Sequence, residues 1–302
     1  MYQILTRSKD LNNPVLGSKL LNKLGLHLFR VNLAERCTRQ RRRFNHNSAS
    51  NWQTNLVRDG AVAIKNFLPD DVFQAVKGEA ETAAVDASHD VPIQQRQGKG
   101  FGPKQYHDWG FDRCDGGTLN RFIDIEPARH PEAYKFSHLP VLSDLTLATG
   151  GRRQKSNHMW FYQTIHGDEK NSTDQQKIFH RDTFFRSIKF WFFVHPVTSN
   201  EGPFCYVPGS HHLTPERRAW EKKKVLEALE KPKGKRSSSF RIADTEIKAL
   251  GLKAPHLFTV PENTLVMADT FGFHCRGAAL AGAERLAIYG NMRPWPFGLW
   301  GS

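Results

Sequence analysis

The feature that most constrains the fold is a series of short, strand-like segments in the second half of the chain. Each is rich in β-branched or aromatic residues, and glycine or proline punctuates the series. The segments span residues 157–165, 187–194, 204–207, 258–260, 264–269 and 285–291. Short strands of this kind are typical of an antiparallel barrel or jelly roll. We therefore predict a mainly β domain with flanking helices, an α+β arrangement.

The remaining segments predict the flanking elements. Residues 14–43 have the leucine pattern of a helix, and residues 60–67 predict a strand that leads into a helix to about residue 84. Residues 86–118 predict an irregular region. Thr214 and Pro215 have the chemistry of a helix start, which predicts a basic helix to about residue 230. With 302 residues, we expect three parts. They are an N-terminal helix or extension at 1–45, a single domain at 46–302, and a basic insertion within it at about 214–257.

The net charge of +13 implies either an anionic partner or well-solvated basic faces. Basic residues gather at 36–43 and at 217–236. The first cluster ends the helix predicted over 14–43, which suggests contact with a peripheral anionic membrane surface. A packed helix with solvated arginines is the alternative. Nucleic acid is not an expected partner, because the clusters contain few aromatic residues and match no RNA- or DNA-binding motif.

Cysteine spacing and hydropathy indicate the cellular compartment in which the protein is expected. The four cysteines, at positions 37, 114, 205 and 275, form no CxxC pair, and no secretory leader precedes them. No apolar run approaches the roughly 18 residues that a spanning helix needs. We expect a cytoplasmic protein whose only membrane contact is peripheral.

His180 and Asp182 are the first candidate metal ligands. Side chains repeat every second residue along a strand, so a histidine and a carboxylate two positions apart project to the same side. Ferrous iron in oxygenases is held by two histidines and one carboxylate, which leaves positions for a cosubstrate and dioxygen. An isolated His-x-Asp is common and is usually a surface turn. The pair predicts an iron site only if a distal histidine joins it.

Three motifs in order resemble the phytanoyl-CoA dioxygenase (PhyH-like) family of iron(II)- and 2-oxoglutarate-dependent oxygenases. They are the His180–Asp182 pair, the turn and strand VHPVTSNEGPFCYVPGSHH at 194–212, and the segment ADTFGFH, which ends at His274 and is followed by Arg285. The resemblance, over roughly residues 157–294, implies a double-stranded β-helix, the cupin-like jelly-roll core of these enzymes. It also implies that His180, Asp182 and His274 bind Fe(II) and that Arg285 binds 2-oxoglutarate.

The resemblance implies weaker assignments around the cosubstrate. Trp191 lies in the strand after the His-x-Asp pair, where family members place a pocket-facing tryptophan, and an aromatic core residue is the alternative. Gln163, on the preceding predicted strand, is a further cosubstrate candidate. Arg276 stands where some members carry a small hydroxyl residue. We expect it to reinforce Arg285 or to face an acidic substrate.

The implied reaction converts 2-oxoglutarate and O2 to succinate and CO2 while a C–H bond is hydroxylated. We expect a small or lipid-linked anionic substrate. Halogenation is disfavoured, because related halogenases lack the carboxylate that Asp182 provides. Two alternatives stay open. One is a non-catalytic jelly-roll protein that binds a metal or ligand, and the other is a zinc site in a hydrolase or structural role, which leaves Arg285 without an explanation.

Overall fold

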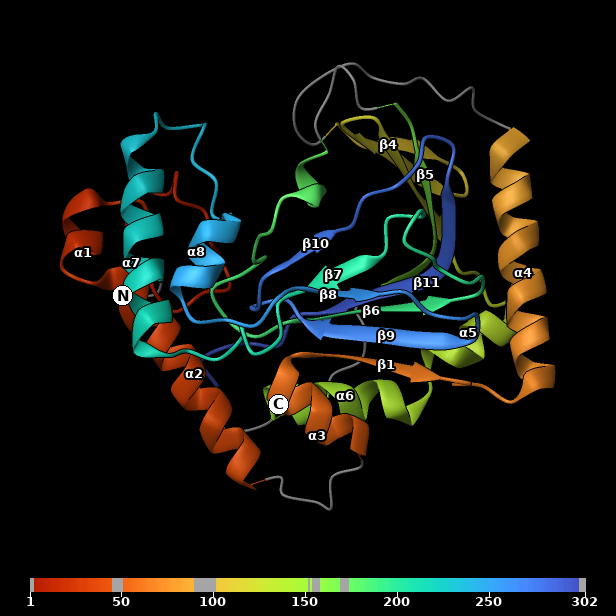
Figure 1. Ribbon diagram of the computed structural model, residues 1–302, viewed down its shortest axis with the longest axis horizontal. Helices are drawn as coiled ribbons and strands as arrows, with labels where there is room; N and C mark the ends of the chain where they lie inside the picture. Colours follow the sequence, from red (N-terminus) through yellow and green to blue (C-terminus); the bar gives the residue numbers. More distant parts are fainter. Residues whose placement is uncertain are drawn as a thin grey trace.

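Two antiparallel sheets pack against each other to form the core of the protein (Figure 1). The computed structural model describes residues 3–44, 51–89, 102–151, 153, 158–168 and 174–298. The large sheet has the order β1-β9-β6-β11-β5-β4-β3-β2, and the small sheet has the order β10-β7-β8. The strands are β1 (Ala61–Lys65), β2 (Gln105–His107), β3 (Gly110–Asp115), β4 (Thr118–Asp124), β5 (Met159–His166), β6 (Ile188–Phe193), β7 (Phe204–Tyr206), β8 (His256–Phe258), β9 (Thr264–Asp269), β10 (His274–Arg276) and β11 (Glu284–Met292).

Strand alternation sorts the side chains of the large sheet between its two faces. In β11, Leu286 and Ile288 pack outward into the helices, whereas Ala287 packs inward with Phe204 of the small sheet. The inner faces of both sheets thus share one apolar cluster. This arrangement is a jelly roll, and it confirms the predicted fold class.

Helices cover the outer face of the large sheet and one end of the molecule (Figure 1). Buried residues of α3 to α6 pack on the outer face of β6, β9 and β11. A second group of helices covers one end of the molecule and comprises α1, α2, α7 and α8. The helices are α1 (Lys19–Lys23), α2 (Leu26–Phe44), α3 (Asn51–Asp59), α4 (Asp70–His89), α5 (Pro131–Ser137), α6 (Pro140–Gly150), α7 (Pro215–Glu230), α8 (Asp244–Ala249) and the 3-10 helix η1 (Gln175–Lys177).

The His-x-Asp segment extends the small sheet beyond β10. His180 forms a bridge with His274 of β10 on one side and with Arg241 on the other. The His180 and His274 backbones exchange hydrogen bonds, with N···O distances of 3.0 and 2.9 Å. The two predicted metal-binding segments therefore lie side by side, although almost a hundred residues separate them in the sequence.

Two predicted elements differ from the structure. The single helix predicted over 14–43 is two helices, α1 and α2, because Gly25 between them has a φ of +103° that a continuing helix does not allow. The irregular region predicted over 86–118 is wrong at both ends. There α4 continues to His89, and residues 105–107 and 110–115 form β2 and β3, while residues 90–101 lie outside the described part of the chain.

The N-terminal helices pack closely on the rest of the protein. Val31 and Ala34 of α2 are buried against Phe184 and Phe185, and Arg41 donates to the backbone carbonyl oxygens of Gly150 and Gly298. Part of the basic cluster predicted to face a partner is therefore used inside the fold. Among the described helices, none has both the length and the apolar character required to cross a membrane.

Candidate metal centre and adjoining pocket

The three predicted metal ligands meet at one point between the sheets. One donor atom from each of His180, Asp182 and His274 lies within 4.8 Å of the others, and all three residues are buried. Both imidazole Nε2 atoms are 3.7 Å from Asp182 Oδ1. The site therefore has the two-histidine, one-carboxylate donor set that suits ferrous iron.

Backbone carbonyl groups orient both imidazoles. His180 Nδ1 is 2.7 Å from the Ile178 carbonyl oxygen, and His274 Nδ1 is 3.0 Å from that of Gly272. A carbonyl oxygen only accepts, so each Nδ1 carries the proton and each Nε2 presents its lone pair to the shared point. Burial lowers the pKa of His180 to about 3 and also lowers that of His274. The imidazoles are therefore neutral, as metal ligation requires.

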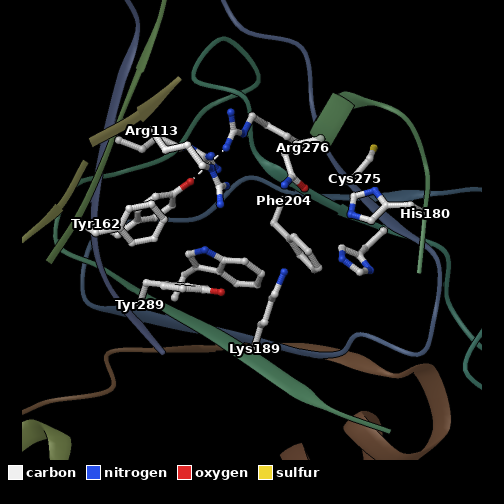
Figure 2. A pocket seen from close by; sticks show the side chains of 13 residues that line it. Arg113, Tyr162, His180, Lys189, Phe204, Cys275, Arg276 and Tyr289 are labelled. Atoms are coloured by element: carbon white, nitrogen blue, oxygen red, sulfur yellow. Dashed lines mark hydrogen bonds between the residues drawn. The ribbon is translucent and has the colours of Figure 1, made fainter. Parts of the chain in front are cut away.

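Lys189 holds the second oxygen of the candidate carboxylate ligand. Its Nζ lies 2.7 Å from Asp182 Oδ2, on the side away from the histidines' contacts with Oδ1. Burial alone raises the pKa of Asp182, but the Lys189 ammonium holds it well below its usual value. Asp182 is thus ionised, with Oδ1 directed to the shared point. Figure 2 shows Lys189 and His180 on the same side of the pocket.

Three arginines line the pocket beyond the candidate metal site. Two of them have acidic partners: Arg276 contacts Asp174 at 2.7 Å, and Arg113 contacts Asp115 at 2.7 Å. The guanidinium of Arg276 also donates to Tyr162 Oη, as the dashed line in Figure 2 shows.

Arg285 is the third arginine, and it has no such partner. Its Nε is buried without a hydrogen bond, and it makes no ion pair with any described residue. Burial, together with the neighbouring Arg276, lowers the pKa of Arg285 to about 10. A buried guanidinium with five donors and no acceptor is suited to a carboxylate supplied by a ligand.

The weaker sequence assignments have different outcomes. Trp191 lines the pocket and packs on Phe204, with ring centroids 4.7 Å apart. Gln163 does not reach the pocket, and its expected role as a cosubstrate contact is not supported. Alternation turns it to the outer face of the sheet, where its Nε2 lies 3.2 Å from Glu284, while its neighbour Tyr162 faces inward. Arg276 is buried in the pocket wall beside Arg285.

A network of buried charges holds the His-x-Asp segment from behind. Arg181 lies between the two candidate ligands and points away from them, with Nε and Nη2 at 2.8 and 2.7 Å from the Glu221 carboxylate of α7. His27 of α2 contacts the same carboxylate at 2.8 Å, and Arg217 contacts it at 3.2 Å. The N-terminal helices and the insertion therefore both support the candidate metal site. Lys9 adds a hydrogen bond to the Asp182 carbonyl oxygen.

Sequence reasoning did not single out Lys189 or Glu221. Strand alternation gave a signal for Lys189, because it lies two residues before Trp191 and so shares its face. Glu221 gave no comparable signal. It lies among lysines and arginines in a helix, and only the fold reveals that it is buried.

A family model described as phytanoyl-CoA dioxygenase (PhyH) matches residues 56–249. This range contains His180 and Asp182 and ends before His274 and Arg285. None of the curated proteins compared with the chain matches it.

Several solved structures resemble the protein at low identity. The epimerase SnoN in complex with Fe3+, alpha ketoglutarate and nogalamycin RO is 13% identical, with a TM-score of 0.49 over 80% of this chain and 81% of that one. AviO1 from Streptomyces viridochromogenes Tue57 is 14% identical, with a TM-score of 0.48 over 81% and 96% of the chains. EctD from S. alaskensis with 2-oxoglutarate and 5-hydroxyectoine is 12% identical, with a TM-score of 0.47 over 85% and 88%.

Proposed function

The chain belongs to the phytanoyl-CoA dioxygenase (PhyH) family of iron- and 2-oxoglutarate-dependent oxygenases, and on that premise we propose which of its residues bind the metal and the cosubstrate. His180, Asp182 and His274 bind the ferrous ion, and Arg285 binds the distal carboxylate of 2-oxoglutarate. One observation carries this proposal. A buried arginine that has no partner among the described residues shares a pocket with a buried His-Asp-His cluster whose Nε2 atoms and Oδ1 face one point.

The donor atoms fit the metal. His274 Nε2 is buried without a hydrogen-bond partner among the described residues, and such an atom is costly unless something binds it. Two neutral nitrogens and one carboxylate oxygen leave room for a bidentate 2-oxoacid and for dioxygen. When bound, iron and 2-oxoglutarate supply the oxidant, with one atom of O2 entering succinate and the other entering the product.

The protein's own residues position this chemistry. Lys189 occupies Asp182 Oδ2, which leaves Oδ1 as the single donor of that carboxylate. Arg285 provides a forked, charge-assisted contact that fixes the cosubstrate's orientation. Asp174 neutralises Arg276, so Arg276 shapes the pocket wall, whereas Arg285 has no acidic partner among the described residues and can bind the cosubstrate. Aromatic side chains, among them Trp191 and Tyr289, form the opposite wall and limit the access of water.

For the substrate, we propose hydroxylation of a C–H bond in a small or lipid-linked anionic molecule. The support is the set of cations that line the pocket, of which Arg113, Lys189 and Arg276 each contact a carboxylate and Arg285 has no acidic partner among the described residues. Residues 1–45 and 214–257 then act as accessory parts of a single oxygenase domain. A cytoplasmic location is proposed from the cysteine pattern alone.

Anaerobic titration of the apo-protein with Fe(II) and 2-oxoglutarate tests the proposal through the weak visible charge-transfer band of the chelate. We expect the band in wild type, its loss in Asp182→Ala, and at least a tenfold weaker 2-oxoglutarate affinity in Arg285→Met, because a charge-assisted contact contributes about 1.5–3 kcal/mol. Arg43→Met, at an exposed arginine, is the matched charge control. Tetrahedral Co(II) spectra without a chelate would favour the zinc alternative. A chelate that never yields succinate would favour a binding protein.

A second proposal concerns membrane contact, which we place on α1. Leu20 and Leu24 are 67% and 77% exposed, and Lys19 and Lys23 lie beside them, a pairing of apolar and cationic groups that suits an anionic lipid surface. Sedimentation with phosphatidylserine-containing vesicles tests it, with Leu20→Ser/Leu24→Ser as the variant. Equal sedimentation of wild type and variant would exclude this contact. Substitution is better than truncation here, because truncation would also remove Lys9, which donates a hydrogen bond to the Asp182 carbonyl oxygen.

A further inference from the structure

Arg241 lies opposite the candidate iron ligand His180, on the neighbouring backbone segment. It forms the bridge with His180, and the flanking backbone bonds are Arg181 N to Phe240 O and Ile242 N to Phe179 O, at 3.0 and 2.9 Å. His180 and Arg241 are therefore a non-hydrogen-bonded antiparallel pair, the closer of the two pair types, with side chains on the same face.

The rear face confirms this orientation. Phe240 and Ile242, on either side of Arg241, belong to an apolar cluster with Trp220 of α7. The guanidinium of Arg181 lies over the Phe240 ring, 4.1 Å from its centroid. Since neighbouring residues alternate, Arg241 points to the opposite side, in one row with His180 and His274.

Arg241 has no partner for its charge. The side chain is partly buried, its Nε is fully buried without a hydrogen bond, and it makes no ion pair with any residue in the described ranges. Arg42 and Arg217 also have one buried unpaired nitrogen, but each donates through another nitrogen. Within the described part of the chain, Arg241 and Arg285 both lack a hydrogen bond at Nε and an ion pair.

The carboxylates around the metal site are already engaged with other cations. Lys189 contacts Asp182 and Arg276 contacts Asp174, both at 2.7 Å, while Glu221 accepts from Arg181 behind the sheet. Burial lowers the pKa of Arg241, and no acidic group offsets that effect. Arg241 is therefore a cation beside His180 that has no acidic partner among the described residues, as Arg285 is on β11.

We propose that Arg241 binds an anionic group of the primary substrate, a carboxylate or a phosphate monoester, and so places the neighbouring carbon at the metal. This inference rests on the proposed function, which assigns Arg285 to 2-oxoglutarate and leaves Arg241 for the second ligand. Both anions fit a guanidinium through forked hydrogen bonds. Arg241 thereby selects anionic over neutral substrates.

Nuclear relaxation measures the contact without a known substrate. The full-length protein is loaded with Mn(II) in place of iron and saturated with 2-oxoglutarate, and the probes are methyl phosphate, observed by 31P, and [1-13C]butyrate, observed by 13C. The paramagnetic ion accelerates relaxation of a probe held near it. We expect saturable enhancement in wild type, at least tenfold weaker apparent affinity in Arg241→Met because charge-assisted contacts are lost, and partial recovery in Arg241→Lys.

Lys233→Met is the matched control, since it removes one exposed positive charge from the same insertion. Enhancement of 31P alone assigns a phosphate monoester, enhancement of 13C alone a carboxylate, and enhancement of both an anion-selective site. Equal affinity in wild type and Arg241→Met, or no enhancement in wild type, overturns the inference. The Fe(II)–2-oxoglutarate band, measured on the same proteins, keeps the two proposals separate. If the band is present but the apparent affinity of the probe does not depend on Arg241, only this inference is refuted. If the band is absent, the proposed function is refuted.

Discussion

Replacing Glu221 by glutamine removes a buried carboxylate behind the His-x-Asp segment. Three basic side chains contact this carboxylate. The Glu221 side chain is fully buried, with Arg181 at 2.7 Å, His27 at 2.8 Å and Arg217 at 3.2 Å. Removing one partner of a buried ion pair costs about 3–5 kcal/mol, because the remaining charge is left without compensation. The amide keeps one acceptor oxygen, so we expect the lower end, about 3 kcal/mol less stability than wild type.

The same substitution is expected to weaken metal binding. Arg181 lies between His180 and Asp182, and its contact with Glu221 fixes the backbone from which both candidate ligands project. Loss of a group that orients metal ligands lowers metal affinity by about 10–100-fold. Co(II) titration of Glu221→Gln should therefore show weaker binding at temperatures where the variant is still folded.

Urea unfolding of the apo-protein measures the stability change, and Glu230→Gln is the control. Glu230 ends the same helix, but its contact with Lys19 is exposed, so the control should match wild type in both assays. A Glu221→Gln protein with wild-type stability and Co(II) affinity would refute the argument that this network positions the metal segment.

Two further predictions concern buried groups other than the candidate ligands themselves. Burial lowers the pKa of His27 and His211 and takes that of His166 to about 2, so below about pH 6.5 the unfolded chain binds protons that the folded state does not. Apo-protein stability should therefore fall with decreasing pH, by at most about 1.4 kcal/mol per pH unit for each histidine, and a flat urea-unfolding profile from pH 7 to 5 would contradict this. In Gly272→Ala, the new Cβ would meet Tyr206 Oη at 1.8 Å, which should cost about 1–3 kcal/mol. Thermal unfolding should show partial recovery when Tyr206→Phe is added, and no loss in the single variant would exclude the clash.

Local sequence patterns predicted that His180 and Asp182 project to the same side, and they predicted most strands of the jelly roll. The alternation of a strand involves only neighbouring residues, so the sequence around Trp191 and Phe193 was sufficient to predict a strand there. Strands β3 and β4 were missed because they bury charge. Asp112 and Arg121 pair across these strands at 3.1 Å, and their polarity breaks the apolar alternation expected of a strand. As a result, β3 fell within the irregular region predicted over 86–118, and no element was predicted for residues 119–124 of β4.

Tertiary pairing could not be predicted from one sequence. His27 and Glu221 are 194 positions apart, and no local pattern joins them. The number of basic residues at 36–43 also overstates the positive charge on the surface. Arg41 is buried there and donates hydrogen bonds to Gly150, Gly298 and Thr38. Net charge reports attraction for anions only for those cations that remain exposed or unpaired.

Charge balance around the candidate metal site leads to the same expectation of an anionic substrate. Lys189 and Asp182 offset each other, so ferrous iron would add two positive charges near Arg285 and Arg241, which have no acidic partner among the described residues. The cosubstrate 2-oxoglutarate brings two negative charges and leaves the site positive. A neutral substrate would enclose that excess in a low-dielectric pocket, whereas an anionic one would reduce it. In Arg241→Met, the discrimination between an acid and its neutral amide should therefore shrink mainly through KM, with kcat less affected.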